Sequence, residues 1–171
     1  DDLFLQLYAS DASVYEIRPL GVVRPRHTDD VVACVQYAAE HEIPIHARGA
    51  GTGLAGESLG RGLVLDFSRY MRRITATDDE TVRVQPGVIH AQLNRHLRPL
   101  GRLFGPDPAM SNVTTMGSVI AIDAAGSHWL RYGCDLPLCV AILFYDISFD
   151  SNLFQSIPFY DITLCLASVG H

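Results

Sequence analysis

The sequence predicts an α+β fold of two small lobes, of which the second is incomplete. Short apolar or alternating segments that are typical of strands are interspersed with two segments of helical periodicity. Pro and Gly residues separate these segments. Hydrophobic residues make up 48% of the 171 residues, which is enough to bury one core or two small ones. We place the first lobe at residues 1–75 and the start of the second at residues 76–133, and leave residues 134–171 unassigned.

A helix is predicted in the first lobe between residues 28 and 41. Thr28 precedes two acidic residues and is suited to be the N-cap, because its hydroxyl can accept a hydrogen bond from a free amide of the first turn. Pro44 follows the helix and cannot continue it. The apolar residues of the helix recur on one face, at Val31, Val35, Ala38 and Ala39.

Two strands are predicted on either side of a glycine-rich stretch in the first lobe. Residues 43–47 alternate in polarity like a short strand and lead directly into that stretch, residues 48–56. Residues 62–67 form a compact apolar run that suits a buried strand, whereas residues 69–73 are polar and suit the surface. The lobe is therefore expected to run in the order strand, helix, strand, loop, strand.

The second lobe is expected to begin with a strand and a helix. Residues 81–85 alternate like a strand, and Pro86 follows them directly. Residues 89–97 have the spacing of an amphipathic helix that stops at Pro99. The region from residue 105 to residue 133 contains both loop and helix signals.

The character of the chain changes after Gly133. Residues 134–171 contain no Lys or Arg and many aromatic side chains. Residues 140–144 suit one strand, but no motif in this tail indicates a chemical function. One hypothesis is that the tail arises from an altered reading frame and that the product is an unstable fragment, which sequencing the parent gene across codon 133 would test.

The net charge and the composition argue against several classes of binding partner and binding site. Thirteen basic and nineteen acidic residues give a net charge of −6, which opposes binding to nucleic acid or anionic lipid. The longest apolar run, residues 138–145, is far shorter than the roughly 20 residues that cross a bilayer, so no membrane span is predicted. The N-terminal residues lack the features of a secretory signal, and we expect a cytoplasmic location. The four cysteines lack zinc-ligand spacing, so no metal site is predicted.

The glycine-rich stretch has the composition of an anion-binding loop. Four glycines among the nine residues from Arg48 to Gly56 let the backbone approach a ligand closely. Successive amides of such a turn can point inward and bind a diphosphate, while Arg48 and Thr52 can add a charge and a donor. A P-loop needs a Lys before Ser or Thr, and a Rossmann fingerprint needs GxGxxG opening a helix, so neither motif is present. Spacing alone leaves a plain surface loop as an equal alternative.

The loop and its neighbours together resemble a known family. In their joint order they resemble the N-terminal half of the FAD-binding domain of the vanillyl-alcohol-oxidase, or p-cresol-methylhydroxylase (PCMH) type, flavoprotein family, in its glycolate-oxidase-subunit and D-lactate-dehydrogenase branch. The resemblance implies a PCMH-type FAD-binding domain of two α+β lobes, and it makes a plain surface loop a minor alternative. The segments that carry it are residues 18–25 (RPLGVVRP), 43–56 (IPIHARGAGTGLAG), 62–69 (GLVLDFSR), 84–88 (VQPGV), 104–118 (FGPDPAMSNVTTMGS) and 124–133 (AAGSHWLRYG).

The resemblance also implies which residues hold a non-covalently bound FAD. Amides of the glycine-rich stretch would wrap the diphosphate, and the segments around Pro106 and Thr115 would lie along the flavin and its ribityl chain. Ser118 stands where the family has a second glycine, so its side chain either donates a hydrogen bond or narrows the slot. The implied FAD-binding residues are Arg48, Gly49, Ala50, Gly51, Thr52, Gly53, Leu54, Ala55, Gly56, Pro106, Thr115, Gly117, Ser118, Gly126 and Tyr132.

The histidines are candidates for covalent flavin attachment, for the core or for the surface. The loop positions that carry the covalent histidine in some relatives hold Ala50 and Leu54 here, so no covalent link is expected. We interpret His46 as a strand residue that is hydrogen-bonded to its surroundings. Trp129 and Tyr132 suit either a flavin ring or the core as their packing partner. We place four histidines at the surface, namely His27, His41, His90 and His96.

In the branch that the chain resembles, a small 2-hydroxy acid passes a hydride to the flavin. The substrate is held there by a separate cap domain, which the 171 residues do not contain, and we assign no catalytic residue. We expect the parent protein to be an FAD-dependent 2-hydroxy-acid dehydrogenase or oxidase, and this chain to be a truncated part with little activity alone. The alternative is a non-catalytic FAD- or nucleotide-binding subunit of an oligomer or larger complex.

Overall fold

The computed structural model describes residues 2–132, 139–143 and 161–168. These residues form two compact units, the first within Asp1–Met71 and the second beginning at Arg72. Both units combine helices with a sheet, in agreement with the α+β class that the sequence predicts. Among the described helices, none has the length and apolar character needed to cross a bilayer.

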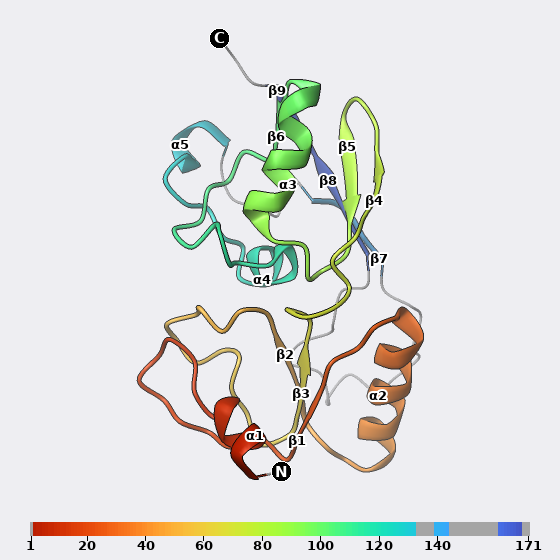
Figure 1. The fold of residues 1–171 in the computed structure, drawn as a ribbon, viewed down its shortest axis with the longest axis vertical. Coiled ribbons are helices and arrows are strands. Elements are labelled where there is room, and N and C mark those ends of the chain that lie inside the picture. The colour runs from red at the N-terminus through yellow and green to blue at the C-terminus, as the bar shows by residue number, and fades with distance from the viewer. Residues whose placement is uncertain (1, 133–138, 144–160, 169–171) are drawn as a thin grey trace. The chain divides into compact units, whose positions relative to one another are not determined.

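The first unit contains a three-stranded parallel sheet with the strand order β1–β3–β2. Helix α2 (Thr28–Glu40) connects β1 to β2 and lies on one side of the sheet, while α1 (Asp2–Leu7) lies on the other (Figure 1). The predicted order of strand, helix, strand, loop and strand is confirmed. The strands are β1 (Gly21–Val23), β2 (Ile45–Arg48) and β3 (Leu63–Asp66).

The start of α2 differs from the prediction by one residue. Thr28 is the first helical residue, and the N-cap is His27. The carboxylate of Asp30 turns back and accepts the backbone N–H groups of Arg26 and His27, at 2.7 and 3.0 Å. The acidic side chain of Asp30 thus binds the amides that precede the helix, in place of the predicted bond from a first-turn amide to the Thr28 hydroxyl, and its charge also suits the helix dipole. The buried face of α2 consists of Val31, Val35 and Ala38, whereas Ala39, the fourth residue of the predicted face, is only half-buried.

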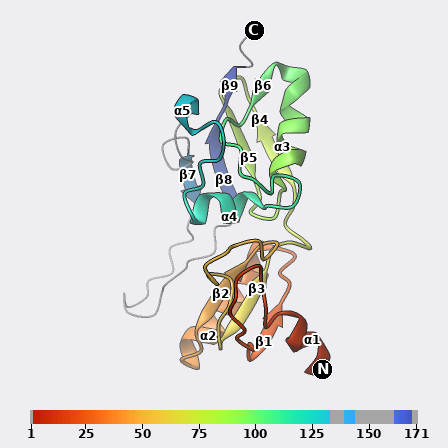
Figure 2. The same ribbon diagram turned by 90° about the vertical axis from the view of Figure 1, so that its left-hand side faces the viewer.

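The second unit contains a four-stranded antiparallel sheet with the strand order β4–β5–β8–β7. Helix α3 lies along this sheet (Figure 2), and a two-stranded pair, β6 (Arg102–Leu103) with β9 (Ala167–Ser168), lies beside it. The four strands are β4 (Ile74–Thr77), β5 (Thr81–Val84), β7 (Cys139–Leu143) and β8 (Asp161–Cys165). The helical segments are α3 (His90–Leu97), the 3-10 turn η1 (Arg98–Leu100), α4 (Met116–Ala121) and α5 (Trp129–Tyr132).

The core of the second unit includes residues from the tail that the sequence left unassigned. Strand β8 lies between β5 and β7, and its Ile162 and Leu164 are fully buried. They pack with apolar side chains of β5, α3 and α4. The other members of this core are Val82, Val84, Val88, Leu93, Leu97, Phe104, Met116, Val119 and Ile120. The described part of the tail is therefore integral to the second unit.

Candidate functional site

The glycine-rich stretch forms an irregular loop between β2 and β3 in the first unit. Gly51 and Gly56 have φ angles of 69° and 79°, in the left-handed region that favours glycine. The loop is held by its carbonyl oxygens: the Gly51 carbonyl accepts the N–H of Ala12 at 3.0 Å, and the Arg48 carbonyl accepts that of Phe67 at 2.9 Å. These two contacts anchor the loop through its carbonyl oxygens and use none of the amides of residues 49–54.

The amides of this loop remain available as donors. Within the part of the chain that the structure describes, the N–H groups of residues 49–54 donate no hydrogen bond. Buried or half-buried amides normally find a partner in the folded chain or in a ligand. Consecutive amides left free in a turn are the arrangement that binds phosphate groups. The amides of residues 49–54 are thus the donors that this loop would offer to a phosphate group, and their binding of a diphosphate stays a prediction.

Arg48 lies next to the loop and has a donor without a partner. Its Nη2 donates to the carbonyl of Ser10 at 2.8 Å, and its guanidinium lies 5.3 Å from the ring centre of Tyr8. A Cβ atom placed on Gly51 would be 2.6 Å from Nη2, so the two residues are in close contact. The Nη1 atom is buried, and the described residues offer it no hydrogen-bond partner. A phosphate oxygen would satisfy this donor, so the residues present fit a diphosphate.

Tyr8 is itself held by a buried polar cluster. Its hydroxyl donates to Oδ2 of Asp66 at 2.6 Å and accepts from Nη2 of Arg24 at 2.7 Å. Arg24 also pairs with Asp66, with Nε and Oδ2 3.3 Å apart. Burial raises the pKa of Tyr8, and the hydrogen bond to the Asp66 carboxylate raises it further. The cluster ties the N-terminal segment to β3 and fixes the ring against which Arg48 packs.

The side chain of Glu57 lies against the loop. A Cβ atom on Gly53 would be 1.7 Å from its Oε1, and its Oε2 accepts the N–H of Ala55 at 3.2 Å. Glu57 is exposed, so its side chain is free to turn toward solvent. The Glu57 carboxylate lies against this backbone, at the place where an anionic ligand would bind. Sequence reasoning did not single out Glu57, because only the folded loop brings it back to Gly53.

In the second unit, the segment around Gly117 packs closely on Pro86. The N–H of Gly117 donates to the Pro86 carbonyl at 2.8 Å, and that of Met116 donates to the Val88 carbonyl at 2.7 Å. A Cβ atom on Gly117 would be 2.8 Å from Cβ of Pro86, so the close approach that requires glycine here is to Pro86. The hydroxyls of Thr115 and Ser118 lie 3.0 Å apart at the start of α4. The structure thus brings together the hydroxyls of two residues that were predicted to bind FAD.

The segments that contain Pro106 and Gly126 are paired. The N–H of Asp107 donates to the Ala125 carbonyl at 3.1 Å, and the Asp107 carbonyl accepts the N–H of Ser127 at 3.3 Å. Gly126 has a φ of 82°, and a Cβ atom there would be 1.9 Å from the Asp107 carbonyl oxygen. The pairing therefore depends on glycine at position 126. The segments of Pro106 and Gly126, two predicted site residues, are thus hydrogen-bonded to each other although they are separated in the sequence.

The histidines differ from the predictions at two positions. His90 was expected at the surface, but it is 2% exposed, because it lies on the same helical face as Leu93 and Leu97. His46 lies on β2 as predicted, but the described residues provide no hydrogen bond to its ring, which packs against Gly60. The predicted exposure of the other three is confirmed, for His27, His41 and His96.

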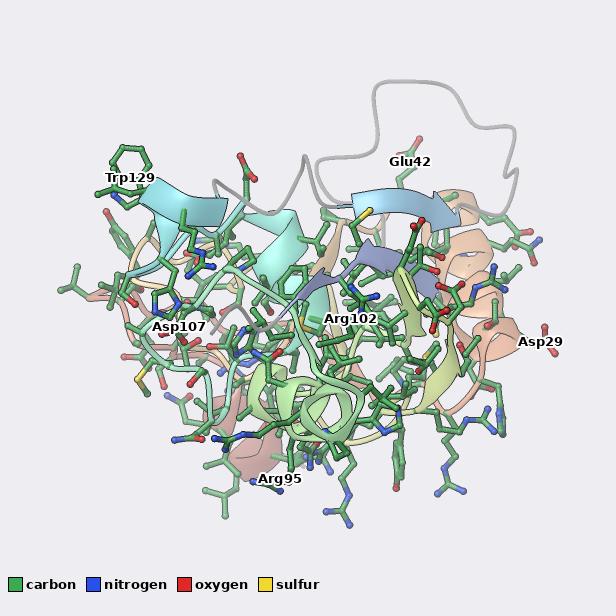
Figure 3. The ribbon with its side chains drawn as sticks, turned by 90° about the horizontal axis from the view of Figure 1, so that it is seen from above. Asp29, Glu42, Arg95, Arg102, Asp107 and Trp129 are labelled. Carbon is green, nitrogen blue, oxygen red and sulfur yellow. The ribbon has the colours of Figure 1, made fainter. Side chains whose placement is uncertain are left out.

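Trp129 projects from the surface of the second unit (Figure 3) and is 58% exposed. The alternative that it packs in the core is therefore wrong, and packing against a flavin stays a prediction. The side chain of Tyr132, which was assigned the same two alternatives, lies outside the described residues.

Lowering the pH from about 7.5 to about 5 is expected to decrease the free energy of unfolding. Burial lowers the pKa of both His46 and His90 below the ordinary value of 6.5. Below pH 6.5 the unfolded chain binds protons at these rings that the folded chain does not, so stability falls as the pH drops through that range. Asp11, Asp30 and Asp78 have pKa values below 3.8 and do not contribute there. Urea denaturation at several pH values measures the slope, and an equal slope in His90→Gln would contradict the assignment to His90.

Comparisons with known proteins agree with the resemblance that the motifs indicated. The model of the FAD binding domain family matches residues 19–141. D-2-hydroxyglutarate dehydrogenase of Escherichia coli (strain K12) is 41% identical over 130 residues, which are 73% of this chain and 13% of that protein. Glycolate oxidase subunit GlcD of Bacillus subtilis (strain 168) is 36% identical over 132 residues, 74% of this chain and 28% of that protein. D-lactate dehydrogenase of Anaerostipes hadrus is 34% identical over 121 residues, 68% of this chain and 25% of that protein.

A solved structure, that of an alkyldihydroxyacetonephosphate synthase, shares the fold with a TM-score of 0.72 and 21% sequence identity. The similarity covers 86% of this chain and 31% of that one. The chain thus spans between 13% and 28% of the length of the three curated relatives. The predicted PCMH-type α+β fold and the predicted FAD cofactor are confirmed by these matches. The chain belongs to the FAD binding domain family.

Proposed function

We propose that this chain is the FAD-binding part of an oxidoreductase that oxidises a small 2-hydroxy acid by hydride transfer to the flavin. The observation that carries the proposal is that, within residues 2–132, 139–143 and 161–168, nothing accepts the amides of the loop residues 49–54 or the buried Nη1 of Arg48 beside them. The relatives support the substrate class, because their names refer to 2-hydroxyglutarate, glycolate and lactate, which are all 2-hydroxy acids. The cap domain that would hold such a substrate is part of the proposal and lies outside this chain.

The bound flavin would supply the hydride acceptor, and the residues of this chain would bind and orient it. In the first unit, the amides of residues 49–53 and Nη1 of Arg48 would donate to the diphosphate. Glu57 would turn away from Gly53, because its carboxylate repels phosphate. In the second unit, the backbone around Pro106 and Gly126 would line the flavin. We propose that FAD is held without a covalent bond, because Ala50 and Leu54 occupy the loop positions of a linking histidine.

FAD titration of the purified chain tests the loop assignment. Arg48→Leu is expected to raise the dissociation constant about tenfold or more, because a hydrogen bond to a charged group is worth about 1.5–3 kcal/mol. Quenching of flavin fluorescence measures the affinity. ADP, which carries the diphosphate without the flavin, is expected to compete with FAD and to lose affinity in the same variant.

Arg61→Leu is the matched control, because Arg61 is an exposed arginine shortly after the loop that, among the described residues, makes no hydrogen bond with the loop backbone. Equal FAD affinities in Arg48→Leu and Arg61→Leu would refute the role of Arg48. Failure of the unaltered chain to bind FAD or ADP would refute the site as a whole.

A second candidate function is that of a non-catalytic FAD-binding subunit in a larger complex. It is favoured by the relative from Bacillus subtilis, which is named as a subunit. Turnover with glycolate, D-lactate or D-2-hydroxyglutarate and a dye acceptor separates the two functions. Substrate-dependent bleaching of the flavin once protein that carries the cap domain is added would support the enzyme, whereas bound flavin that no substrate bleaches under the same conditions would support the non-catalytic subunit.

A further inference from the structure

Two side chains of α3 hold the backbone of the segment that contains Pro106. Asn94 accepts the N–H of Phe104 through Oδ1 at 2.7 Å and donates to the carbonyl of the same residue through Nδ2 at 3.2 Å. His90, one helical turn earlier, contacts the Pro106 carbonyl through Nε2 at 2.7 Å. The two side chains therefore satisfy three backbone groups of an irregular segment, as a neighbouring strand would do.

The contact with Pro106 determines the proton position on the His90 ring. A carbonyl oxygen can only accept, so Nε2 carries the proton and Nδ1 is the acceptor. Nδ1 is buried, and the described residues offer it no partner. A second proton would bury a charged ring with an unsatisfied donor, so burial keeps the pKa of His90 low and the ring neutral, although the nearby Asp107 carboxylate opposes this.

The segment that contains Pro106 is hydrogen-bonded to residues 125–127, so its position affects theirs. Asp107, the residue after Pro106, exchanges backbone hydrogen bonds with Ala125 and Ser127 at 3.1 and 3.3 Å. The Ser127 hydroxyl also donates to Oδ2 of Asp107 at 3.1 Å. Because Asp107 is hydrogen-bonded to both neighbours of Gly126, and Gly126 lies close against the Asp107 carbonyl, we expect displacement of one segment to displace the other. The two side chains of α3 thus control backbone that they do not touch.

We propose that His90 and Asn94 are positioning residues for the flavin, and we call this pair the α3 clamp. The inference rests on the proposed function, in which the backbone around Pro106 and Gly126 lines the flavin. The clamp holds that backbone in place from the side of the core, whereas the glycine loop in the first unit binds the diphosphate. Disturbing the clamp is therefore expected to change the environment of the flavin ring and to leave the binding of ADP unchanged.

His90→Phe removes the donor with a ring of similar size, whereas His90→Gln keeps an N–H donor at the end of the side chain. In the full chain without FAD, His90→Phe is expected to accelerate hydrogen exchange at the amides of Asp107 and Ser127 about tenfold, the effect of losing one buried hydrogen bond. With FAD bound, it is expected to shift the visible absorption bands of the flavin. His90→Gln is expected to restore both properties.

Asn94→Asp provides a second variant should His90→Phe fail to fold, since it keeps the acceptor for the N–H of Phe104 but replaces the donor to the Phe104 carbonyl by a carboxylate oxygen, which repels that carbonyl. It is expected to accelerate exchange in the same segment. Arg95→Gln is the control, because Arg95 is an exposed residue on the same helix that points away from the core (Figure 3).

The outcomes separate the clamp from the proposed function. If the unaltered chain binds no FAD, the proposed function fails, and the flavin role of the clamp fails with it. If the chain binds FAD but exchange and spectrum in His90→Phe and Asn94→Asp match those in Arg95→Gln, the clamp alone is overturned. The clamp is also overturned if His90→Gln behaves like His90→Phe, or if ADP affinity falls together with the spectral change.

Discussion

Leu164→Ala is expected to lower the free energy of unfolding of the second unit by about 2–5 kcal/mol. Leu164 lies on β8 opposite Val82 of β5 and is fully buried. Truncation removes apolar contacts and leaves a cavity that the surrounding sheet and helices can fill only in part. Urea denaturation followed by circular dichroism measures the change, and hydrogen exchange at β5 shows whether the second unit is the part affected.

Thr163→Ala is the matched control for Leu164→Ala. Thr163 is the preceding residue, faces the opposite side of the sheet and is only half-buried. Its replacement is expected to change stability by no more than about 0.5 kcal/mol. Equal stabilities of the two variants would show that β8 does not belong to this core, and would favour the hypothesis that residues 134–171 arise from an altered reading frame.

Gly62→Ala is expected to lower the free energy of unfolding of the first unit by about 3 kcal/mol, the upper range for overpacked sites. Gly62 is buried, and a Cβ atom there would lie 1.7 Å from the carbonyl oxygen of Pro44. That oxygen accepts the N–H of Leu63 at 2.8 Å, so a shift that relieves the clash also weakens a hydrogen bond beside the β2–β3 pairing. Chemical denaturation measures the loss.

Gly101→Ala separates the steric effect at Gly62 from the conformational effect of losing a glycine. Gly101 has a φ of 66°, and a Cβ atom there would meet nothing within 4 Å. Its replacement is expected to cost about 1 kcal/mol, because only the left-handed backbone is strained. A Gly62→Ala variant that is as stable as Gly101→Ala would mean that β2 and β3 are less closely packed than the structure indicates.

The elements with strong local signals could be predicted from the sequence. Helix α2 has its apolar face at regular spacing and a proline after its end, and β3 is a compact apolar run. β4 could not be recognised, because it is an edge strand whose middle residues, Thr75 and Ala76, are both exposed and therefore show no alternation. The pairing of β8 with β5 could not be predicted either, since strands so far apart in the chain leave no local sequence pattern of their pairing.

In the candidate site, too, local features could be predicted from the sequence, whereas contacts between distant residues could not. The glycine loop was recognised from its composition and from the order of its neighbouring motifs. The residues that hold the loop, among them Ser10, Ala12 and Tyr8, were not, because they reach it only after the N-terminal segment folds over. His90 was assigned to the surface because it shows no metal-ligand spacing in the sequence. Its spacing from Leu93 and Leu97 was the available signal, and it indicated burial.

The sequence by itself determined the family, the cofactor and the position of the loop, because glycine content and the order of short motifs are properties of the chain alone. Only the tertiary structure decided which loop donors and which atom of Arg48, its Nη1, find no partner among the described residues, and that α3 holds the backbone around Pro106. Hydrogen bonds form only between groups brought to within about 3 Å of each other, and the folded chain determines which groups those are.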